Sequence, residues 1–330
     1  MSEEHHVEGV YQGRGVPHRG IARLSPPPPW RTFDGGPLVP APHTPRDGSE
    51  EVQRARSYEA EPAVVEMVNA ALLLRRPLLV TGRPGSGKSS LAHSIAHELQ
   101  LGPVLRWPIV RASTLKNALY EYDALARMQE ANLRRVGDTP LDVGSYIRLG
   151  PLGTALLPTP HPRVVLIDDF DQSDFDLPNE LLPILEEGEF EIPELVRISA
   201  SEPWVQVMTA DGERVSVQGG RVRCHAFPVI VFTSSGEREF PPRFLRRCLH
   251  LGLRPPNRQQ IESIVAAHLG SETLARSQPA IEEFLNRQAQ GDVSTDQLLN
   301  AVFLATSWGS SDSARLAARL MTPREAEFHE

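Results

Sequence analysis

The stretch "LLVTGRPGSGKSSLA", residues 78–92, joins a short apolar run, a glycine-rich turn and the start of an amphipathic helix. From Gly82 to Ser89 it follows the pattern GxxxxGK[ST]. A strand before this pattern and a helix after it are typical of a loop that binds nucleotide phosphates, because glycines let backbone N–H groups turn towards the anion and the helix N-terminus adds its dipole. We therefore expect a nucleotide-binding protein.

The residues expected to bind the phosphates are those of the loop and the first helical turn: Gly82, Pro84, Gly85, Ser86, Gly87, Lys88, Ser89 and Ser90. Lys88 is placed to reach the outer phosphate oxygens, and the Ser89 hydroxyl is placed to bind Mg²⁺. The alternative is a glycine-rich turn between a strand and a helix that binds nothing.

A second apolar run ends in a cluster of acids, "VVLIDDFDQSD" at residues 164–174. We predict a buried strand whose last residues emerge at the carboxyl edge of the sheet, where open α/β folds bind ligands. Asp168 is then placed to bind Mg²⁺, and Asp169 to polarise an attacking water. In the alternative interpretation, the polar residues after the strand cap the next helix; these are Asp171, Ser173 and Asp174.

A third stretch, "FPVIVFTSSGEREFPPRFLRRC" at residues 227–248, predicts another buried strand, a polar exit and a short helix opened by prolines. Three arginines of that helix are spaced to share one face and suit an anion such as a neighbouring subunit's phosphate; they are Arg243, Arg246 and Arg247. The alternative is a solvated basic face, or salt bridges to Glu237 and Glu239.

The apolar runs lack the polar alternation of half-buried strands and alternate with helix-like segments. Such strands are typical of a parallel sheet flanked by helices. After residue 253 only helical patterns remain, and Ser294 and Gln297 have the spacing of a reciprocal helix cap. We predict a P-loop α/β domain with a parallel sheet over residues 56–253, followed by a small all-helical lid domain and tail over 254–330.

Residues 1–55 are rich in proline, include "SPPPPW" at 25–30 and show no helical or strand periodicity. We expect an extended arm. It is either a solvated tail, which we favour, or a docking arm that lies on a neighbouring subunit or partner.

The composition excludes several classes of protein. A formal net charge of −8 argues against a general electrostatic grip on nucleic acid or on an anionic membrane. The two cysteines, Cys224 and Cys248, are too few for a disulfide framework or a zinc site and fit a reducing compartment. The start lacks the pattern of a secretory signal, and the longest apolar stretch is interrupted by arginines. We therefore expect a cytoplasmic protein.

With the phosphate loop, the acidic strand end, the polar strand exit and the arginines in this order, residues from about 55 to 310 resemble AAA+ ATPases, and specifically the MoxR-like group. Further stretches look like the insert, the Gly-Pro-Leu segment, the stretch after Walker B and the β-hairpin of that group. They are "LYEYDA" at 119–124, "IRLGPLGTALL" at 147–157, "LEEGEFEIPE" at 185–194 and "VQVMTADGERVSV" at 205–217.

The resemblance implies that Gly82 to Ser89 form Walker A and that Asp168 and Asp169 form Walker B. It places Ser235 at sensor 1 and makes Arg246 or Arg247 the arginine finger. It also implies ATP and Mg²⁺ as ligands, and a ring, usually hexameric, in which each site is completed by the next subunit. Proteins with a von Willebrand factor A domain are the partners it suggests.

The sequence departs from that pattern at three positions. Asp169 stands where Glu is usual, Ser235 where Asn is usual, and the helix "STDQLLNAVFL" at 294–304 lacks the expected sensor 2 arginine, for which Arg315 or Arg319 are substitutes. A carboxylate one methylene shorter lies about 1 Å further from the water, which costs on the order of 100-fold in rate. We therefore expect slow hydrolysis with ATP and Mg²⁺ binding intact.

Three functions compete at this point. The first is an oligomeric ATPase that remodels a protein partner. The second is a nucleotide-dependent switch or scaffold in which occupancy is the signal. The third is a phosphotransferase acting on a small molecule, for which the sequence offers no acceptor site.

Overall fold

The computed structural model describes residues 9–43, 48–133, 142–290 and 293–307. The suggested substitutes for sensor 2, Arg315 and Arg319, lie outside the described residues, as do both chain ends.

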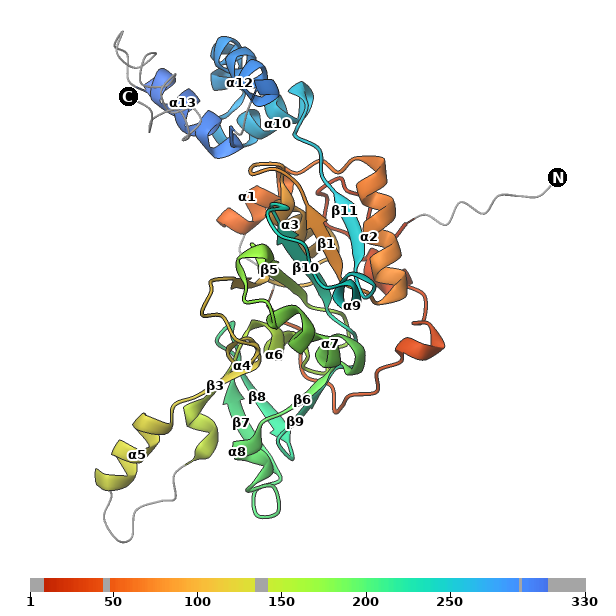
Figure 1. The fold of residues 1–330 in the computed structure, drawn as a ribbon, viewed down its shortest axis with the longest axis vertical. Helices are drawn as coiled ribbons and strands as arrows, with labels where there is room; N and C mark the ends of the chain where they lie inside the picture. Colours follow the sequence, from red (N-terminus) through yellow and green to blue (C-terminus); the bar gives the residue numbers. More distant parts are fainter. Residues whose placement is uncertain (1–8, 44–47, 134–141, 291–292, 308–330) are drawn as a thin grey trace, which may run out of the picture.

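The centre of the molecule is a five-stranded, all-parallel sheet with the order β11-β1-β10-β5-β2 (Figure 1). Its strands are β1 (Leu78–Thr81), β2 (Leu105–Pro108), β5 (Val164–Asp168), β10 (Val229–Ser234) and β11 (Leu249–Gly252). The prediction of a parallel sheet flanked by helices is confirmed. Since all strands run the same way, the phosphate loop after β1, the acids after β5 and the polar exit of β10 emerge at one edge.

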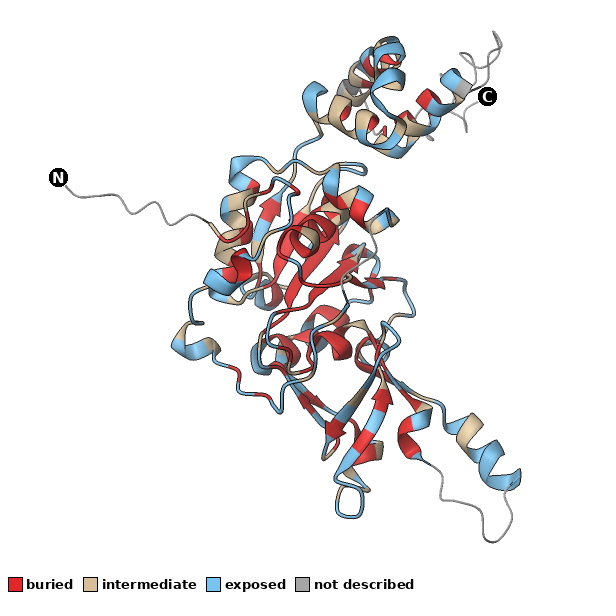
Figure 2. Cartoon of the chain, turned by 180° about the vertical axis from the view of Figure 1, so that it is seen from behind, coloured by how far each residue is buried: buried red, intermediate tan, exposed pale blue. Residues whose placement is uncertain are grey.

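Alternate residues of the strands enter two separate cores, one on each face of the sheet. Leu78, Val164 and Val231 pack with α2 (Pro62–Leu74) and α3 (Lys88–Glu98). Leu79, Ile167 and Phe232 pack with the helices of the other face, which are α6 (Pro151–Ala155), α7 (Leu177–Glu187) and α9 (Pro242–Leu245). Figure 2 shows the sheet as the buried centre between these layers. This burial of both faces explains why the strands read as continuous apolar runs.

A second sheet, which the sequence indicated only by one hairpin, lies at the end of the molecule away from the C-terminal helices (Figure 1). Its order is β3-β4-β7-β8-β9-β6, with β3 at Tyr120–Tyr122, β4 at Ile147–Leu149, β6 at Glu189–Glu191, β7 at Trp204–Met208, β8 at Arg214–Gln218 and β9 at Arg221–Arg223. The expected hairpin is β7–β8. The short helices α4 (Leu115–Leu119), α5 (Ala124–Leu133) and α8 (Pro193–Val196) belong to the same region.

The C-terminal helices form a unit with its own apolar core, which includes Ile261, Phe284 and Leu298. They are α10 (Arg258–Leu269), α11 (Ser271–Arg276), α12 (Gln278–Gln290) and α13 (Thr295–Ser307). The reciprocal cap predicted at the start of α13 is present: the Ser294 N–H donates to Gln297 Oε1 and the Gln297 N–H to Ser294 Oγ. Helix α11 was not predicted.

The expectation of a solvated N-terminal arm is wrong for the described residues. The arm is extended apart from two 3₁₀ turns, η1 (Gly20–Arg23) and η2 (Pro29–Arg31), but Tyr11 is fully buried and packs on α2 and α3. Helix α1 (Glu50–Arg56) also begins inside the segment expected to lack helix. Trp30, by contrast, is exposed.

The arm is held by one buried carboxylate. Glu98, at the end of α3, is fully buried and accepts hydrogen bonds from the backbone N–H groups of residues 12 to 15 at 2.5 to 3.2 Å. The Tyr11 hydroxyl bonds to Ser94 Oγ at 2.8 Å. An extended segment without internal hydrogen bonds can be buried only if such partners exist, and these partners lie more than 80 residues away in the sequence.

We predict that Glu98→Gln lowers the free energy of unfolding by about 3 kcal/mol, because an amide replaces one acceptor oxygen by a donor that faces backbone N–H groups. Urea denaturation measures the loss, and limited proteolysis should cut the variant before residue 20 faster than the wild type. Glu202→Gln changes an exposed acid and serves as control. Equal midpoints for the Glu98 variant and the control would contradict the assigned role.

Candidate nucleotide-binding site

The phosphate loop joins β1 to α3 and has the geometry that its glycines permit. Gly85 and Gly87 have φ of +77° and +87°, a region that favours glycine. A Cβ at Gly85 would lie 2.7 Å from the backbone nitrogen of Thr295, and one at Gly87 would lie 3.0 Å from the Tyr58 ring. Helix α3 begins directly afterwards without a side-chain cap, so its first N–H groups are available to an anion.

The Lys88 side chain lies against this loop. Its Nζ donates to the carbonyl oxygens of Gly82 and Arg83 at 2.7 and 3.1 Å. Burial lowers the pKa of Lys88, and the negative charges of Asp169, Asp171 and Asp168 act in the opposite direction. The lysine is therefore held between the loop and a group of acids, where a phosphate would compete for its ammonium group.

One carboxylate oxygen connects the loop to two strands. Asp168 Oδ1 accepts hydrogen bonds from Ser89 Oγ and Thr233 Oγ1, each at 2.7 Å. Thr233 Oγ1 in turn accepts the Asp169 N–H at 2.9 Å, and the Thr233 side chain is fully buried. For Thr233 the sequence predicted only that it belongs to the polar end of a strand. The identity of a threonine does not reveal which distant group its hydroxyl will bond to.

These residues fit a nucleotide and a magnesium ion. A hydroxyl and a carboxylate, those of Ser89 and Asp168, meet beside the loop, and oxygen ligands are what Mg²⁺ prefers. The Ser86 hydroxyl in the loop is buried and has no hydrogen-bond partner among the described residues. A buried polar atom of this kind in a glycine-rich loop suits a phosphate oxygen.

Asp169, the predicted water-polarising residue, lies just beyond β5 in the left-handed region, with φ 56° and ψ 49°. Its side chain is exposed. Burial of part of the carboxyl raises its pKa, and the neighbouring charges of Asp168 and Asp171 raise it further. Asp169 is thus near the phosphate loop but open to solvent.

The alternative in which the acids after β5 cap the next helix is wrong. Residues Phe170–Gln172 form the 3₁₀ turn η4, and α7 begins only at Leu177, with Asp176 at its N-cap position and no side-chain cap bond. Asp171 instead accepts two hydrogen bonds from Ser235, through Oδ2, from the backbone N–H at 3.1 Å and from Oγ at 2.5 Å. Ser235, the residue expected at sensor 1, is therefore paired with Asp171, which was expected to cap a helix in the alternative interpretation.

The three arginines do not share one helix face as expected. Helix α9 ends at Leu245, so Arg246 is its C-cap and Arg247 lies beyond it. Arg247 forms an ion pair with Glu186 at the end of α7, and not with the acids that were proposed as partners. Among the described residues, no salt bridge joins Arg243 or Arg246 to an acid, and both side chains are exposed.

The C-terminal helices reach the phosphate loop directly. Thr295 Oγ1, at the start of α13, donates to the Gly85 carbonyl oxygen at 2.9 Å. The sequence contains no signal for this contact, which links residues 210 positions apart. The lid helix and the loop therefore cannot move independently without breaking it.

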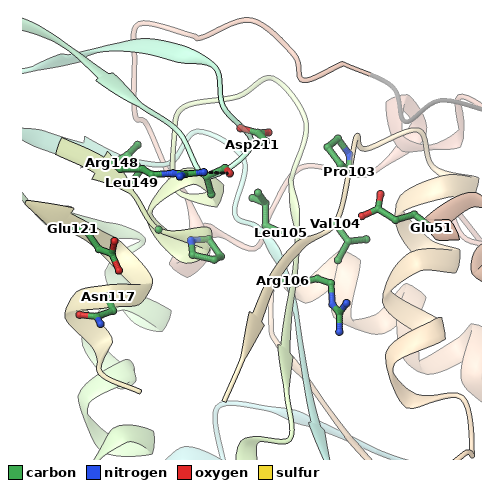
Figure 3. A pocket seen from close by; sticks show the side chains of 13 residues that line it. Glu51, Pro103, Val104, Leu105, Arg106, Asn117, Glu121, Arg148, Leu149 and Asp211 are labelled. Atoms are coloured by element: carbon green, nitrogen blue, oxygen red, sulfur yellow. Dashed lines mark hydrogen bonds between the residues drawn. The ribbon is translucent and has the colours of Figure 1, made fainter. Parts of the chain in front are cut away.

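A hollow of about 470 Å³ lies beside β2, the edge strand of the parallel sheet, between α1 and the second sheet. Figure 3 shows Arg106 and Glu51 on one side of it and Arg148 and Glu121 on the other. Arg106 Nη2 also lies 3.5 Å from Asp168 Oδ2. Burial raises the pKa of Glu51, and the charge of Arg106 opposes that shift. The hollow thus shares one arginine with the phosphate site.

The chain matches the model of the AAA domain (dynein-related subfamily) over residues 77–248. That range is more than half of the 330 residues, and it contains the phosphate loop, Asp168 and Asp169 at the end of β5, and the arginines after β10. The chain belongs to this family, and its fold is an AAA+ core followed by a helical part. The MoxR-like group named by the resemblance is not part of that finding.

Two solved structures are distantly similar to this chain. NtrX from Brucella abortus in complex with ATP is 15% identical with a TM-score of 0.39, and the alignment covers 86% of this chain and 57% of that one. Domain III of the replication initiation protein DnaA from Thermotoga maritima is 18% identical with a TM-score of 0.41, with 87% and 100% covered. The chain spans little more than half of the NtrX chain. A search of curated proteins gives no match.

No helix within the described ranges has both the length and the apolar character needed to cross a membrane.

We predict that Thr233→Val lowers the rate of ATP turnover by about tenfold or more, because the Asp169 N–H loses its acceptor and Asp168 Oδ1 loses a donor, and leaving a buried polar group unsatisfied costs about 1–3 kcal/mol. Thr233→Ser keeps the hydroxyl and should stay within about twofold of wild type. Steady-state release of phosphate measures both. Equal rates for the Val and Ser variants would show that the hydroxyl does not matter.

Proposed function

We propose that the protein binds ATP with Mg²⁺ and hydrolyses it slowly, within a ring of identical subunits, to remodel or activate a protein partner as MoxR-like AAA+ ATPases do. The observation that carries this proposal is the hydrogen bond between Ser89 of the phosphate loop and Asp168 at the end of β5. It brings together the two oxygen ligands that a P-loop ATPase uses for magnesium.

In this proposal each residue of the site has one task. Lys88 exchanges its hydrogen bonds to the loop carbonyls for bonds to the outer phosphates. Ser89 and Asp168 hold Mg²⁺, which when bound offsets the negative charge of the phosphates. Asp169 orients the attacking water, and Ser235 follows the neighbouring strand β10, where it is bonded to Asp171.

We assign the arginine that completes a neighbouring site to Arg246 rather than Arg247. Arg247 is held by Glu186 of its own chain, and breaking that pair would cost part of the gain at the neighbouring site. Arg246 is exposed, and its backbone is fixed because its carbonyl oxygen accepts from Arg76 Nη1 at 2.9 Å. Ring formation and a partner with a von Willebrand factor A domain rest on the family resemblance alone.

A second candidate function is a nucleotide-dependent switch or scaffold with very slow turnover. Two observations favour it: Asp169 stands at the position of the usual Glu, and Ser235 is already bonded to Asp171. Occupancy of the site would then be the signal, transmitted through the contact between Thr295 and Gly85.

We predict that wild-type protein hydrolyses ATP and that Lys88→Ala abolishes both hydrolysis and nucleotide binding, since the ammonium group is the main cation of the loop. Asp169→Glu should raise the turnover rate by up to about 100-fold without changing ATP affinity. Phosphate release and calorimetric titration measure the two quantities. If the wild type binds ATP but hydrolyses it no faster than Lys88→Ala, the switch function replaces the ATPase function.

We predict that Lys88→Ala and Arg246→Ala are each inactive but regain activity when mixed, because a subunit lacking the arginine still binds ATP and its Lys88→Ala neighbour supplies the arginine. A random ring gives about a quarter of the wild-type rate, since one interface in four has the productive order. Light scattering in parallel measures assembly. Arg247→Ala mixed with Lys88→Ala is the matched control, and recovery that requires Arg247 instead would reverse the assignment.

A further inference from the structure

Arg31, in the turn η2 of the N-terminal arm, binds the ends of two helices at once. Its Nη2 donates to the Arg75 carbonyl oxygen, at the end of α2, at 2.7 Å. Its Nη1 donates to the carbonyl oxygens of Leu185 and Glu186, at the end of α7, at 2.8 and 3.2 Å. Carbonyl groups there lack partners within the helix, and a cation suits the helix dipole. One guanidinium group therefore joins helices that cover opposite faces of the parallel sheet.

Aromatic rings and a reciprocal hydrogen bond hold this guanidinium group in place. Its Cζ lies 5.0 Å from the centroid of the Phe33 ring and 4.5 Å from that of the Phe227 ring. Arg75 in turn donates through Nη2 to the Ser25 carbonyl oxygen of the arm at 2.7 Å. A planar group that packs on rings and makes hydrogen bonds along its edge has little freedom. The arm and the end of α2 are thus fixed to one another.

The same two helix ends hold the segment that carries the arginine assigned to a neighbouring site. Arg76, directly after Arg75, donates through Nη1 to the Arg246 carbonyl oxygen at 2.9 Å. Glu186, whose carbonyl oxygen accepts from Arg31, forms the ion pair with Arg247 through its carboxylate. Two consecutive residues after α9 are therefore held by groups that Arg31 fixes.

The link through α2 depends on an unusual backbone conformation. Arg75 lies in the left-handed region, with φ 52° and ψ 44°, which is unfavourable for a residue with a Cβ. The hydrogen bond from Arg31 to its carbonyl oxygen stabilises this conformation. Since the backbone of Arg75 sets the direction in which Arg76 leaves the helix, loss of the Arg31 side chain would release the contact from Arg76 to Arg246.

The charges around Arg31 agree with these contacts. Burial lowers the pKa of Arg31 to about 10, and the positive charges of Arg76 and Arg247 lower it further, while Glu186 opposes the shift. Arg31 remains charged at neutral pH. The arm therefore contributes a third cation to a cluster that Glu186 holds together.

This cluster lies at the edge of the sheet opposite to the phosphate loop. Residues 75–76 precede β1 and residues 246–247 precede β11, whereas the loop follows β1. Four strand residues separate the two edges by about 13 Å. An effect of Arg31 on ATP turnover through residues 246–247 is therefore expected at the site of a neighbouring subunit and not at the site of its own chain.

We propose that Arg31 is a positioning residue for the arginine that completes a neighbouring site: it fixes the ends of α2 and α7, which hold Arg246 and Arg247, so that Arg246 reaches the nucleotide of the next subunit. This inference rests on the proposed function as a ring ATPase. Misplacement of a catalytic group by about 1 Å costs on the order of 100-fold in rate. The arm thus supports catalysis without contacting the nucleotide.

The test uses the mixture of Lys88→Ala and Arg246→Ala chains, in which the Lys88→Ala chain supplies the arginine. Arg31→Ala added to the Lys88→Ala chain should lower the recovered rate of phosphate release by about tenfold. The same change added to the Arg246→Ala chain, which binds the ATP, should leave the rate and the calorimetric ATP affinity within about twofold. Equal losses in the two placements would show a general structural role and overturn the inference, as would no loss in either.

The matched control is Arg19→Ala, which removes an exposed arginine of the same arm. It should leave the recovered rate within about twofold in both placements. Light scattering on each mixture checks that the rings assemble equally.

Arg76→Ala tests the path through α2, because it removes the hydrogen bond to the Arg246 carbonyl oxygen and leaves the contacts of Arg31 in place. In the Lys88→Ala chain it should also cost about tenfold in recovered rate. Arg31→Ala and Arg76→Ala together should cost about 20-fold, since residues that act through one contact are not additive. A loss of about 100-fold, the product of the two, would show that they act independently and would overturn the path.

Amide hydrogen exchange measures the positioning without ATP or a ring. The amides of residues 245–248 donate to carbonyl oxygens within residues 241–245. In full-length Arg31→Ala they should exchange about tenfold faster than in wild type, while the amides of residues 88–95 in α3 keep their rates. Unchanged exchange at residues 245–248 would overturn the inference.

If Arg31→Ala does not fold, Arg31→Lys takes its place, because one ammonium group cannot replace a guanidinium fork that reaches both helix ends. A loss of about threefold or more confined to the Lys88→Ala placement supports the inference, and no loss contradicts it. Failure of the proposed function is distinct: Lys88→Ala and Arg246→Ala chains would then show no recovery even with Arg31 intact. The exchange rates at residues 245–248 would still decide whether Arg31 holds that segment.

Discussion

One oxygen atom, Asp168 Oδ1, holds the centre of this site together. It accepts hydrogen bonds from Ser89 of the phosphate loop and from Thr233 of β10. The loop after β1, the end of β10 and the end of β5 are therefore joined at this atom. The strand order β1-β10-β5 makes this possible, because β10 lies between the strand that leads into the loop and the strand that carries the acid. The other features of the site are arranged around this contact.

Little positive charge lies near the carboxylates at this edge of the parallel sheet. Three carboxylates act on Lys88, and Arg106 approaches Asp168 only at 3.5 Å. Like charges held close together destabilise one another. A site of this kind has a surplus of negative charge that a magnesium ion would reduce, whereas the loop and Lys88 attract phosphate.

Parts of the chain outside the matched family domain also contact the phosphate loop. Tyr58 packs beside Gly87, and Thr295 bonds to Gly85. The N-terminal arm is anchored through Glu98 at the far end of α3, the same helix that begins at Lys88. Helix α3 is therefore in contact with the loop at one end and with the arm at the other, and the arm contributes to the core that supports it.

The sequence by itself determined the elements that depend on neighbouring residues: the phosphate loop, the apolar strands, the reciprocal cap of α13 and the membership of a P-loop fold. Such features are local, since periodicity and turn chemistry act over a few positions. Only the tertiary structure decided which distant residues form hydrogen bonds and ion pairs with one another. Asp171 meets Ser235 across 64 positions, Arg247 meets Glu186 across 61, and the arm meets Glu98 across more than 80. A polar side chain carries the same letter whether it caps a helix, faces solvent or accepts a distant hydrogen bond, and only the packing of the sheet fixes which of these it does.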